Sequence, residues 1–226
     1  MQRLLVDTAY LVEEGQREVH LYRPPARGRV PLLVVYDGTD YLQRGRLVNI
    51  VDNLIAERRI RPIAMAMLQN GGRRRPVEYA CSDATVNWLD SVILPLAEEE
   101  LSLLDLRRSP GAHGVLGASF GGLMSLYTGL RMPEIFGRVL CQSGVFALGG
   151  RDAAAVDLLR YGHAKDELDI WMDAGALDFL LDDSRRLQPL LRERGYRVSY
   201  RESGGGHNYT SWRDHIWRGL EALFPA

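Results

Sequence analysis

The sequence predicts an α/β fold built on a mostly parallel, doubly wound sheet. Two apolar runs, 32–36 and 63–68, have the composition of strands that are buried on both faces of a parallel sheet. Between them, apolar residues at positions 47, 50, 51, 54 and 55 follow the spacing of an amphipathic helix. A further short strand at 115–116 leads through a glycine-rich turn into another helical pattern. Strands that alternate with helices in this way predict helices on both faces of one sheet.

The first half of the chain contains the predicted edge and the first buried strands. Residues 4–22 predict two antiparallel strands joined by a turn at 13–16, and strand 32–36 ends in a turn at 37–40. We expect the helix over 47–55 to end near Arg61-Pro62, and residues 69–78 to form a loop. Asp83 is expected to cap a helix whose apolar face comprises residues 86, 89, 93 and 96.

The second half continues the alternation of helices and strands. The pattern predicts helices at 123–130, 152–161, 181–194 and 212–223, and strands at 137–142, 168–172 and 196–202. Residues 145–168 fit the pattern least well, and we expect a small cap over a site there.

Length and charge limit the classes of protein to which the chain can belong. Its 226 residues are enough for a sizeable core, and we expect a single domain over 1–226. The 28 Lys and Arg residues nearly balance the 29 Asp and Glu residues, giving a formal charge of -1. A broad basic surface, as nucleic-acid binding requires, is therefore not expected.

The distribution of apolar residues and cysteines indicates a soluble, cytoplasmic protein. The apolar runs are far shorter than the ~20 residues that cross a bilayer, and Glu13 and Glu14 precede any stretch that resembles a signal peptide. Cys81 and Cys141 have neither metal-ligand nor disulfide spacing, so we expect buried thiols in a reducing compartment.

The segment from Gly117 to Gly121, with the sequence Gly-Ala-Ser-Phe-Gly, predicts a nucleophile elbow. Small neighbours allow the backbone to turn sharply between strand and helix, with the hydroxyl of Ser119 pointing outward. Glycine-rich turns also join strands to helices in proteins without catalytic activity. The interpretation therefore depends on an acid and a histidine that follow in that chain order.

His207 is the candidate base, because a serine hydroxyl needs a proton acceptor with a pKa near neutrality. It lies in the glycine-rich segment 203–208, directly after the predicted strand 196–202. His215 is the nearest rival but falls within the last predicted helix. We expect structural roles for the remaining histidines: His20, His113 and His163.

The candidate acid follows the predicted strand 168–172. Asp178 is best placed there, with Asp173 as the alternative; Asp182 and Asp183 fit the start of the next helix. Ser119, Asp178 and His207 occur in the chain order typical of α/β-hydrolases.

An oxyanion hole requires two backbone N–H groups directed at the developing negative charge. Phe120 supplies one, as the residue after the nucleophile. The turn after strand 32–36 supplies the other, where Gly38 allows a tight bend and Thr39 follows.

Several motifs together resemble the putative-esterase branch of the α/β-hydrolases. That branch includes enterochelin and related siderophore esterases, S-formylglutathione hydrolases, feruloyl esterases and mycolyltransferases. The resemblance spans about residues 30–223, and its motifs lie at 36–38, 75–78, 117–122, 133–137, 142–144 and 205–212.

The resemblance implies Ser119 as nucleophile, His207 as base, Asp178 at the acid position, and the amides of Thr39 and Phe120 as oxyanion donors. Some siderophore esterases of this branch use a Ser–His pair, so it leaves open whether the acid is needed. Through the Asp-Gly turn at 37–38 and the Arg-x-x-Glu segment at 75–78, the chain resembles the enterochelin esterase type. We expect it to lack the additional N-terminal domain of the cytoplasmic enzymes and the export signal of the periplasmic ones, which leaves the siderophore open.

Three further residues are candidates for substrate binding. Arg75 would hold an anionic group or, alternatively, pair with Glu78; Tyr209 and Trp212 would line a pocket or pack against the last helix. Arg73 and Arg74 fit a solvated loop.

We therefore expect a serine esterase that acts on a small-molecule ester and needs neither metal nor cofactor. A thioesterase or acyltransferase and a non-catalytic binding module are the alternatives. The acyl and alcohol groups and the oligomeric state are left open by the sequence.

Overall fold

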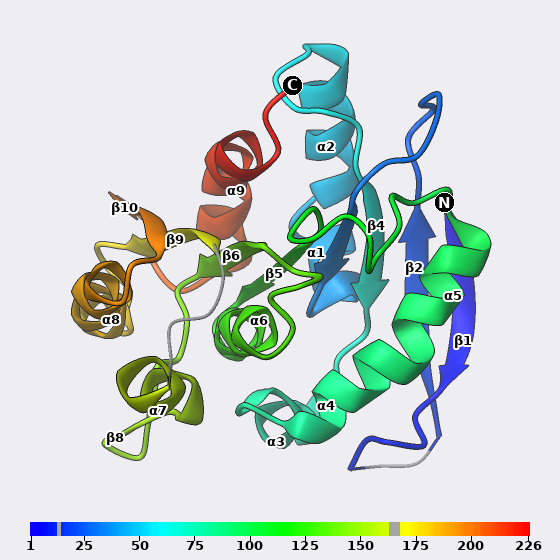
Figure 1. Cartoon of the computed structure of the whole chain (residues 1–226). Coiled ribbons are helices and arrows are strands. Elements are labelled where there is room, and N and C mark those ends of the chain that lie inside the picture. The colour runs from blue at the N-terminus through cyan, green and yellow to red at the C-terminus, as the bar shows by residue number, and fades with distance from the viewer. Residues whose placement is uncertain (13–14, 163–167) are drawn as a thin grey trace.

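A computed structural model describes residues 1–12, 15–162 and 168–226. Across these residues, eight strands form one sheet in the order β1-β2-β4-β3-β5-β6-β9-β10 (Figure 1). The strands are β1 (Gln2–Asp7), β2 (Gln16–Tyr22), β3 (Leu32–Val35), β4 (Ala64–Leu68), β5 (Gly114–Ala118), β6 (Arg138–Gln142), β9 (Asp169–Gly175) and β10 (Arg197–Ser203).

The sheet is mostly parallel, as predicted. Strand β2 pairs antiparallel with β1 and β4, and every other neighbouring pair is parallel. The predicted antiparallel edge is therefore confirmed, whereas the turn predicted at 13–16 falls partly on residues 13–14, which lie outside the described residues. Six neighbouring strands, β4, β3, β5, β6, β9 and β10, run in one direction. Their carboxyl ends therefore meet at one edge of the sheet, where ligands bind in doubly wound folds.

Helices cover both faces of the sheet (Figure 1). One face is covered by α1 (Gly38–Gln43), α2 (Leu47–Ala56) and α9 (Tyr209–Leu223), whose buried side chains pack in one apolar cluster. The other is covered by α4 (Asp83–Trp88), α5 (Leu94–Glu100), α6 (Phe120–Arg131), α7 (Ala154–Tyr161) and α8 (Leu181–Glu193), which pack in a second cluster. The doubly wound arrangement is thus confirmed.

The stretch between β4 and β5 departs from the prediction in two respects. Residues 69–78, expected as a loop, contain a 3₁₀ turn at Gly72–Arg74 and the short helix α3 (Arg75–Tyr79). The side chain of Ser82, and not Asp83, caps α4 by accepting a hydrogen bond from the N–H of Thr85. A π-helical segment, Leu89–Ile93, then joins α4 to α5.

Three element boundaries near the predicted site also differ. Helix α1 begins at Gly38 where only a turn was predicted, β9 continues to Gly175, and α9 begins at Tyr209 because Asn208 caps it. Within the predicted cap region, a small hairpin of β7 (Ala147–Leu148) and β8 (Arg151–Asp152) precedes α7. The rest of that prediction falls partly on residues 163–167, which lie outside the described residues.

The predicted structural roles of two histidines are consistent with their burial. His113 Nδ1 accepts a hydrogen bond from the Leu32 N–H, and burial lowers its pKa from 6.5 to about 4, so the ring is neutral. His20 is buried as well, whereas His163 lies outside the described residues. Both cysteines are free thiols; Cys141 is buried, and Cys81 is only partly buried.

The described helices include none that combines the length and the apolar character needed to cross a bilayer.

Candidate active site

Ser119 lies on a sharp turn between β5 and α6, as the elbow motif predicts. Its backbone has φ 59 and ψ -123, a conformation that residues with a Cβ rarely adopt. Close packing explains the flanking glycines: a Cβ at Gly117 would lie 2.3 Å from the backbone of Gly121, and one at Gly121 would lie 2.8 Å from the Asp37 carboxylate. The turn is also held by the Ser119 N–H, which donates to the Gln142 carbonyl at 2.9 Å.

The structure brings the three predicted catalytic side chains together, although they are far apart in the chain. His207 Nε2 lies 3.0 Å from Ser119 Oγ. On the other side of the ring, Nδ1 lies 3.0 Å from both carboxylate oxygens of Asp178. The Asp178 side chain is fully buried and that of His207 is 18% exposed, so the acid is shielded while the base remains accessible.

The turn that carries Asp178 is joined to the loop that carries His207 by backbone hydrogen bonds. The Leu177 N–H donates to the Gly205 carbonyl at 3.0 Å, and a Cβ on Gly175 would lie 2.1 Å from that same oxygen. Asp178 Oδ1 also accepts from the Leu180 N–H at 2.8 Å, which fixes the carboxylate within its own turn. These contacts hold the acid and the base in a fixed relation.

Asp173, the alternative acid, lies in β9 and does not contact His207. Its Oδ2 accepts hydrogen bonds from Gln142 Nε2 at 3.0 Å and Trp171 Nε1 at 3.4 Å. Burial raises the pKa of Asp173 from 3.8 to about 7. Because β9 extends past this residue, its side chain faces the interior instead of the rim.

Gln142 connects the elements that surround the three side chains. Its Nε2 donates to Asp173 and to the Trp212 carbonyl, and its Oε1 accepts from the Tyr41 hydroxyl at 3.0 Å. The next residue, Ser143, adopts φ 48, and its Oγ accepts from Trp212 Nε1 at 3.0 Å. This buried network was not predicted, although the segment 142–144 stood out as a motif.

Aromatic rings lie on both sides of the His207 imidazole. Trp212 packs edge-on against it with ring centroids 5.0 Å apart, and Phe179 lies tilted over it at 4.5 Å. Tyr209 packs against Trp212 with ring centroids 4.9 Å apart, and the guanidinium of Arg44 lies 4.5 Å from the ring centroid of Tyr209. Tyr209 and Trp212 are both buried, so the structure shows packing roles for the two residues; lining a pocket stays a prediction.

Thr39 and Phe120 are the residues whose backbone N–H groups are expected to form the oxyanion hole. Each lies in the first turn of a helix, α1 or α6, where backbone N–H groups have no acceptor within the helix. The Thr39 hydroxyl oxygen is buried and has no hydrogen-bond partner among the described residues. Gly38 has no room for a side chain, because a Cβ would lie 2.3 Å from the backbone of Met67.

Arg75 binds Asp37, the residue that precedes α1. Its Nε and Nη2 donate to the two carboxylate oxygens of Asp37 at 2.6 Å each, and Nη2 also donates to the Ala118 carbonyl at 3.1 Å. Asn70 Nδ2 donates to the same carboxylate at 2.8 Å. Burial alone would lower the pKa of Arg75, but the hydrogen bonds and charge of Asp37 raise it. Arg75 therefore links the α1 turn to the strand before Ser119.

The alternative pairing predicted for Arg75 is wrong. Glu78 instead pairs with Arg17 at 2.8 Å, because the helical turn of α3 directs it toward β2. Arg73 and Arg74 are exposed, as expected for a solvated loop. An anionic-substrate role for Arg75 stays a prediction, and its guanidinium is already engaged by Asp37.

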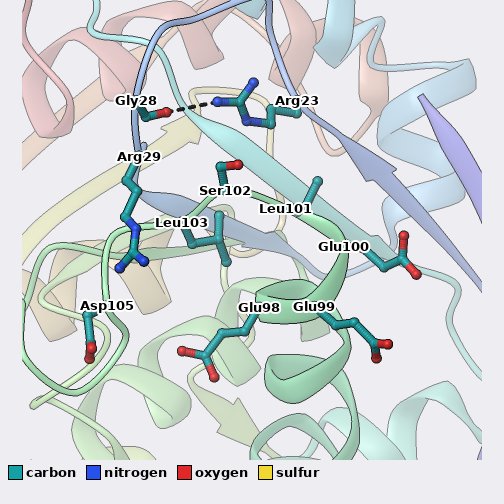
Figure 2. A pocket seen from close by; sticks show the side chains of 10 residues that line it. All are labelled: Arg23, Gly28, Arg29, Glu98, Glu99, Glu100, Leu101, Ser102, Leu103 and Asp105. Carbon is teal, nitrogen blue, oxygen red and sulfur yellow. Dashed lines mark hydrogen bonds between the residues drawn. The ribbon is translucent and has the colours of Figure 1, made fainter.

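A polar cavity of about 590 Å³ lies at the other end of the sheet (Figure 2). It is lined by the loop after β2 and the end of α5, including Arg23, Arg29 and Glu98. Arg23 donates to the Gly28 carbonyl at 2.8 Å across its upper part. The cavity lies beside the start of β3, whereas Ser119 follows the end of β5, which runs parallel to β3. The cavity is therefore separate from Ser119, Asp178 and His207.

Comparison with known proteins identifies relatives among esterases. A family described as "Putative esterase" matches residues 12–223. Iron(III) enterobactin esterase of Escherichia coli (strain K12) is 27% identical over an alignment of 201 residues that covers 86% of this chain and 50% of that protein. The chain thus spans about half the length of the curated relatives of this kind that it matches.

Solved structures show the same fold. The crystal structure of the enterobactin esterase FES from Shigella flexneri in the presence of enterobactin superposes with a TM-score of 0.87 at 24% identity, covering 98% of this chain and 58% of that one. A ferulic acid esterase superposes with a TM-score of 0.79 at 16% identity over 99% and 96% of the two chains. The chain therefore has the α/β-hydrolase fold.

Proposed function

The chain belongs to the putative esterase family, and from that premise we propose that it is a serine hydrolase that cleaves carboxylic esters through an acyl-enzyme intermediate. The observation that carries the proposal is the continuous contact from Asp178 through His207 to Ser119, each step at 3.0 Å. The roles of the three residues follow from what each atom can donate or accept.

In the proposed acylation step, Asp178 accepts a hydrogen bond from Nδ1–H of His207, which leaves the lone pair on Nε2. Nε2 takes the hydroxyl proton of Ser119 as Oγ attacks the ester carbonyl carbon. The carbonyl oxygen becomes an oxyanion, which the backbone N–H groups of Thr39 and Phe120 stabilise. The carbon–oxygen bond to the alcohol then breaks, and Nε2 returns its proton to the alcohol oxygen.

Deacylation uses the same groups with water in place of the serine. His207 Nε2 accepts a proton from the water as its oxygen attacks the acyl carbon. The bond to Ser119 Oγ breaks, Oγ recovers the proton, and the carboxylic acid leaves. Trp212 and the buried Asp178 keep the imidazole in the orientation that both steps require.

A catecholate siderophore ester is the substrate we favour. Support comes from the curated relatives named iron(III) enterobactin esterases, which are 27% identical to this chain. Esters of hydroxycinnamic acids and thioesters of glutathione are the alternatives that a substrate panel separates.

The test is hydrolysis of p-nitrophenyl butyrate by the wild-type chain and by Ser119→Ala. We expect the variant to keep its thermal unfolding midpoint within ~2 °C and to lose roughly 10³-fold or more in kcat, as nucleophile deletions do. A fluorophosphonate probe should label the wild type at Ser119 only. Turnover unchanged by the substitution would refute the assignment of the nucleophile, and an unlabelled wild type would favour a binding module.

A further inference from the structure

Two large apolar side chains lie exposed on either side of the buried Asp178. Leu177 is 82% exposed and Phe179 is 78% exposed, whereas the carboxylate between them is fully covered. Single exposed apolar residues are common on protein surfaces. These two differ because they lie on the turn that positions the base, and one of them contacts the imidazole.

The turn from Ala176 to Leu180 presents these side chains on a fixed backbone. The N–H groups of Ala176 and Leu177 donate to the carbonyls of Ser203 and Gly205 at 2.6 and 3.0 Å. The N–H groups of Leu180 and Leu181 donate to Asp178 itself. With these polar groups engaged within the protein, the two apolar side chains dominate the surface that the turn presents.

Phe179 lies beside the imidazole that handles the proton. Its ring centroid is 4.5 Å from that of His207, and the planes are inclined by 43°. Trp212 holds the imidazole from another side and is buried, so the Phe179 ring is the aromatic neighbour that stays open to solvent. A group that receives a proton from His207 Nε2 must come within hydrogen-bond distance of it, and hence close to this ring.

We propose that Phe179 and Leu177 form the binding surface for the alcohol portion of the ester and select an apolar, preferably aromatic alcohol. The inference rests on the proposed function, because it uses the step in which His207 protonates the leaving alcohol. It identifies the leaving group as the part of the substrate that meets this surface. The charged groups of glutathione and the hydroxyl groups of a sugar find neither a charge nor a hydrogen-bond partner on these two side chains, which are both apolar.

The test uses methyl, butyl and benzyl butyrate, which share one acyl group and differ in the alcohol. Since kcat/KM reports every step up to release of the alcohol, we expect Phe179→Ala to lower it about tenfold for the benzyl ester and less than about twofold for the methyl ester. For the benzyl ester, kcat/KM of Phe179→Leu should lie between the values for wild type and Phe179→Ala. Leu177→Ala should also lower kcat/KM for this ester, by a smaller factor.

Deacylation gives the readout that a merely structural role would change. The acyl-enzyme formed from all three esters is the same, and its hydrolysis uses His207 after the alcohol has left. We therefore expect the steady-state rate that follows a p-nitrophenyl butyrate burst to stay within about twofold of wild type in Phe179→Ala. Leu5→Ala, at a 59% exposed position on β1 at the far edge of the sheet, is the matched control.

Equal losses for all three alcohols, accompanied by slower deacylation, would mean that Phe179 only orients His207 and would overturn the proposal. Unchanged kcat/KM for the benzyl ester would overturn it as well. Failure of the proposed function gives a different result, because the wild type itself would then hydrolyse none of the three esters. Thermal unfolding of each variant verifies that the fold is retained.

Discussion

The pair formed by Arg75 and Asp37 leads to a quantitative prediction for stability and activity. The Asp37 side chain is 1% exposed and that of Arg75 is 23% exposed, so removing the arginine leaves a carboxylate with almost no access to water. Arg75→Met keeps most of the apolar stem but deletes two hydrogen bonds to Asp37 and one to the Ala118 carbonyl. Breaking a buried pair from one side costs about 3–5 kcal/mol.

The reverse substitution should cost less. Asp37→Asn keeps an acceptor for Asn70 and tolerates the φ of 55 at this position, and the guanidinium that it leaves behind still reaches solvent. We expect a loss of about 1–3 kcal/mol for this variant. In the double variant no uncompensated charge remains, so its loss should be smaller than the sum of the two single losses.

Thermal and urea unfolding of the four proteins measure this cycle. For a chain of this size, the loss in Arg75→Met corresponds to a decrease of roughly 6–20 °C in the unfolding midpoint. Because Asp37 begins the turn that carries the Thr39 N–H, kcat for p-nitrophenyl butyrate should also fall, by about tenfold to a hundredfold. Additive losses in the cycle, with a coupling below about 0.5 kcal/mol, would refute the reasoning.

Three other substitutions test the remaining parts of the site. Asp178→Asn should lower kcat for p-nitrophenyl butyrate by roughly 10³–10⁴-fold with little change in stability, because the amide lacks the charge that stabilises the imidazolium and its NH₂ group favours the wrong tautomer of His207; a variant that keeps a tenth of the activity would instead assign the chemistry to a Ser–His pair. Asp173 has its pKa raised to about 7 by burial, so its stabilising contribution is complete below its unfolded-state pKa of 3.8 and is lost as the pH rises toward 7. The free energy of unfolding of Asp173→Asn, relative to that of wild type, should therefore increase as the pH rises over this range, by at most about 1.4 kcal/mol per pH unit in urea unfolding. The opposite effect of His113 is the same in both proteins and therefore cancels. Parallel curves of unfolding free energy against pH would contradict this. Gly117→Ala should destabilise the fold by about 3 kcal/mol or more, because the new Cβ would lie 2.3 Å from the Gly121 backbone, and a wild-type urea midpoint would contradict the packing argument.

The sequence was sufficient to predict the fold and the chain order of the site, because both depend on local patterns. Continuous apolar runs predicted β3 and β4, and the small residues around Ser119 predicted the sharp turn there. The choice between Asp178 and Asp173 could not be made with certainty, since it depends on how far β9 extends before it turns. Asp173 lies within β9, where side chains alternate between the two faces of the sheet, whereas Asp178 follows the end of the strand.

The long-range contacts were not predictable. Arg75 meets Asp37 across 38 residues, and its partner depends on α3, a five-residue helix with no periodic signal. The roles of Gln142 and Ser143 likewise arise from side chains that only the folded sheet brings near them. Phe179 had no signal except its position next to the candidate acid.

The buried amide of Gln142 has a consequence for how the protein acquires activity. It joins Tyr41, Asp173 and Trp212, which come from elements separated by most of the chain. Its three bonds can form together only after β9 has paired with β6 and the last helix has docked. Under the proposed function, ester cleavage during refolding would therefore be a probe of complete assembly, and intermediates that lack the C-terminal elements should be inert however much secondary structure they have gained.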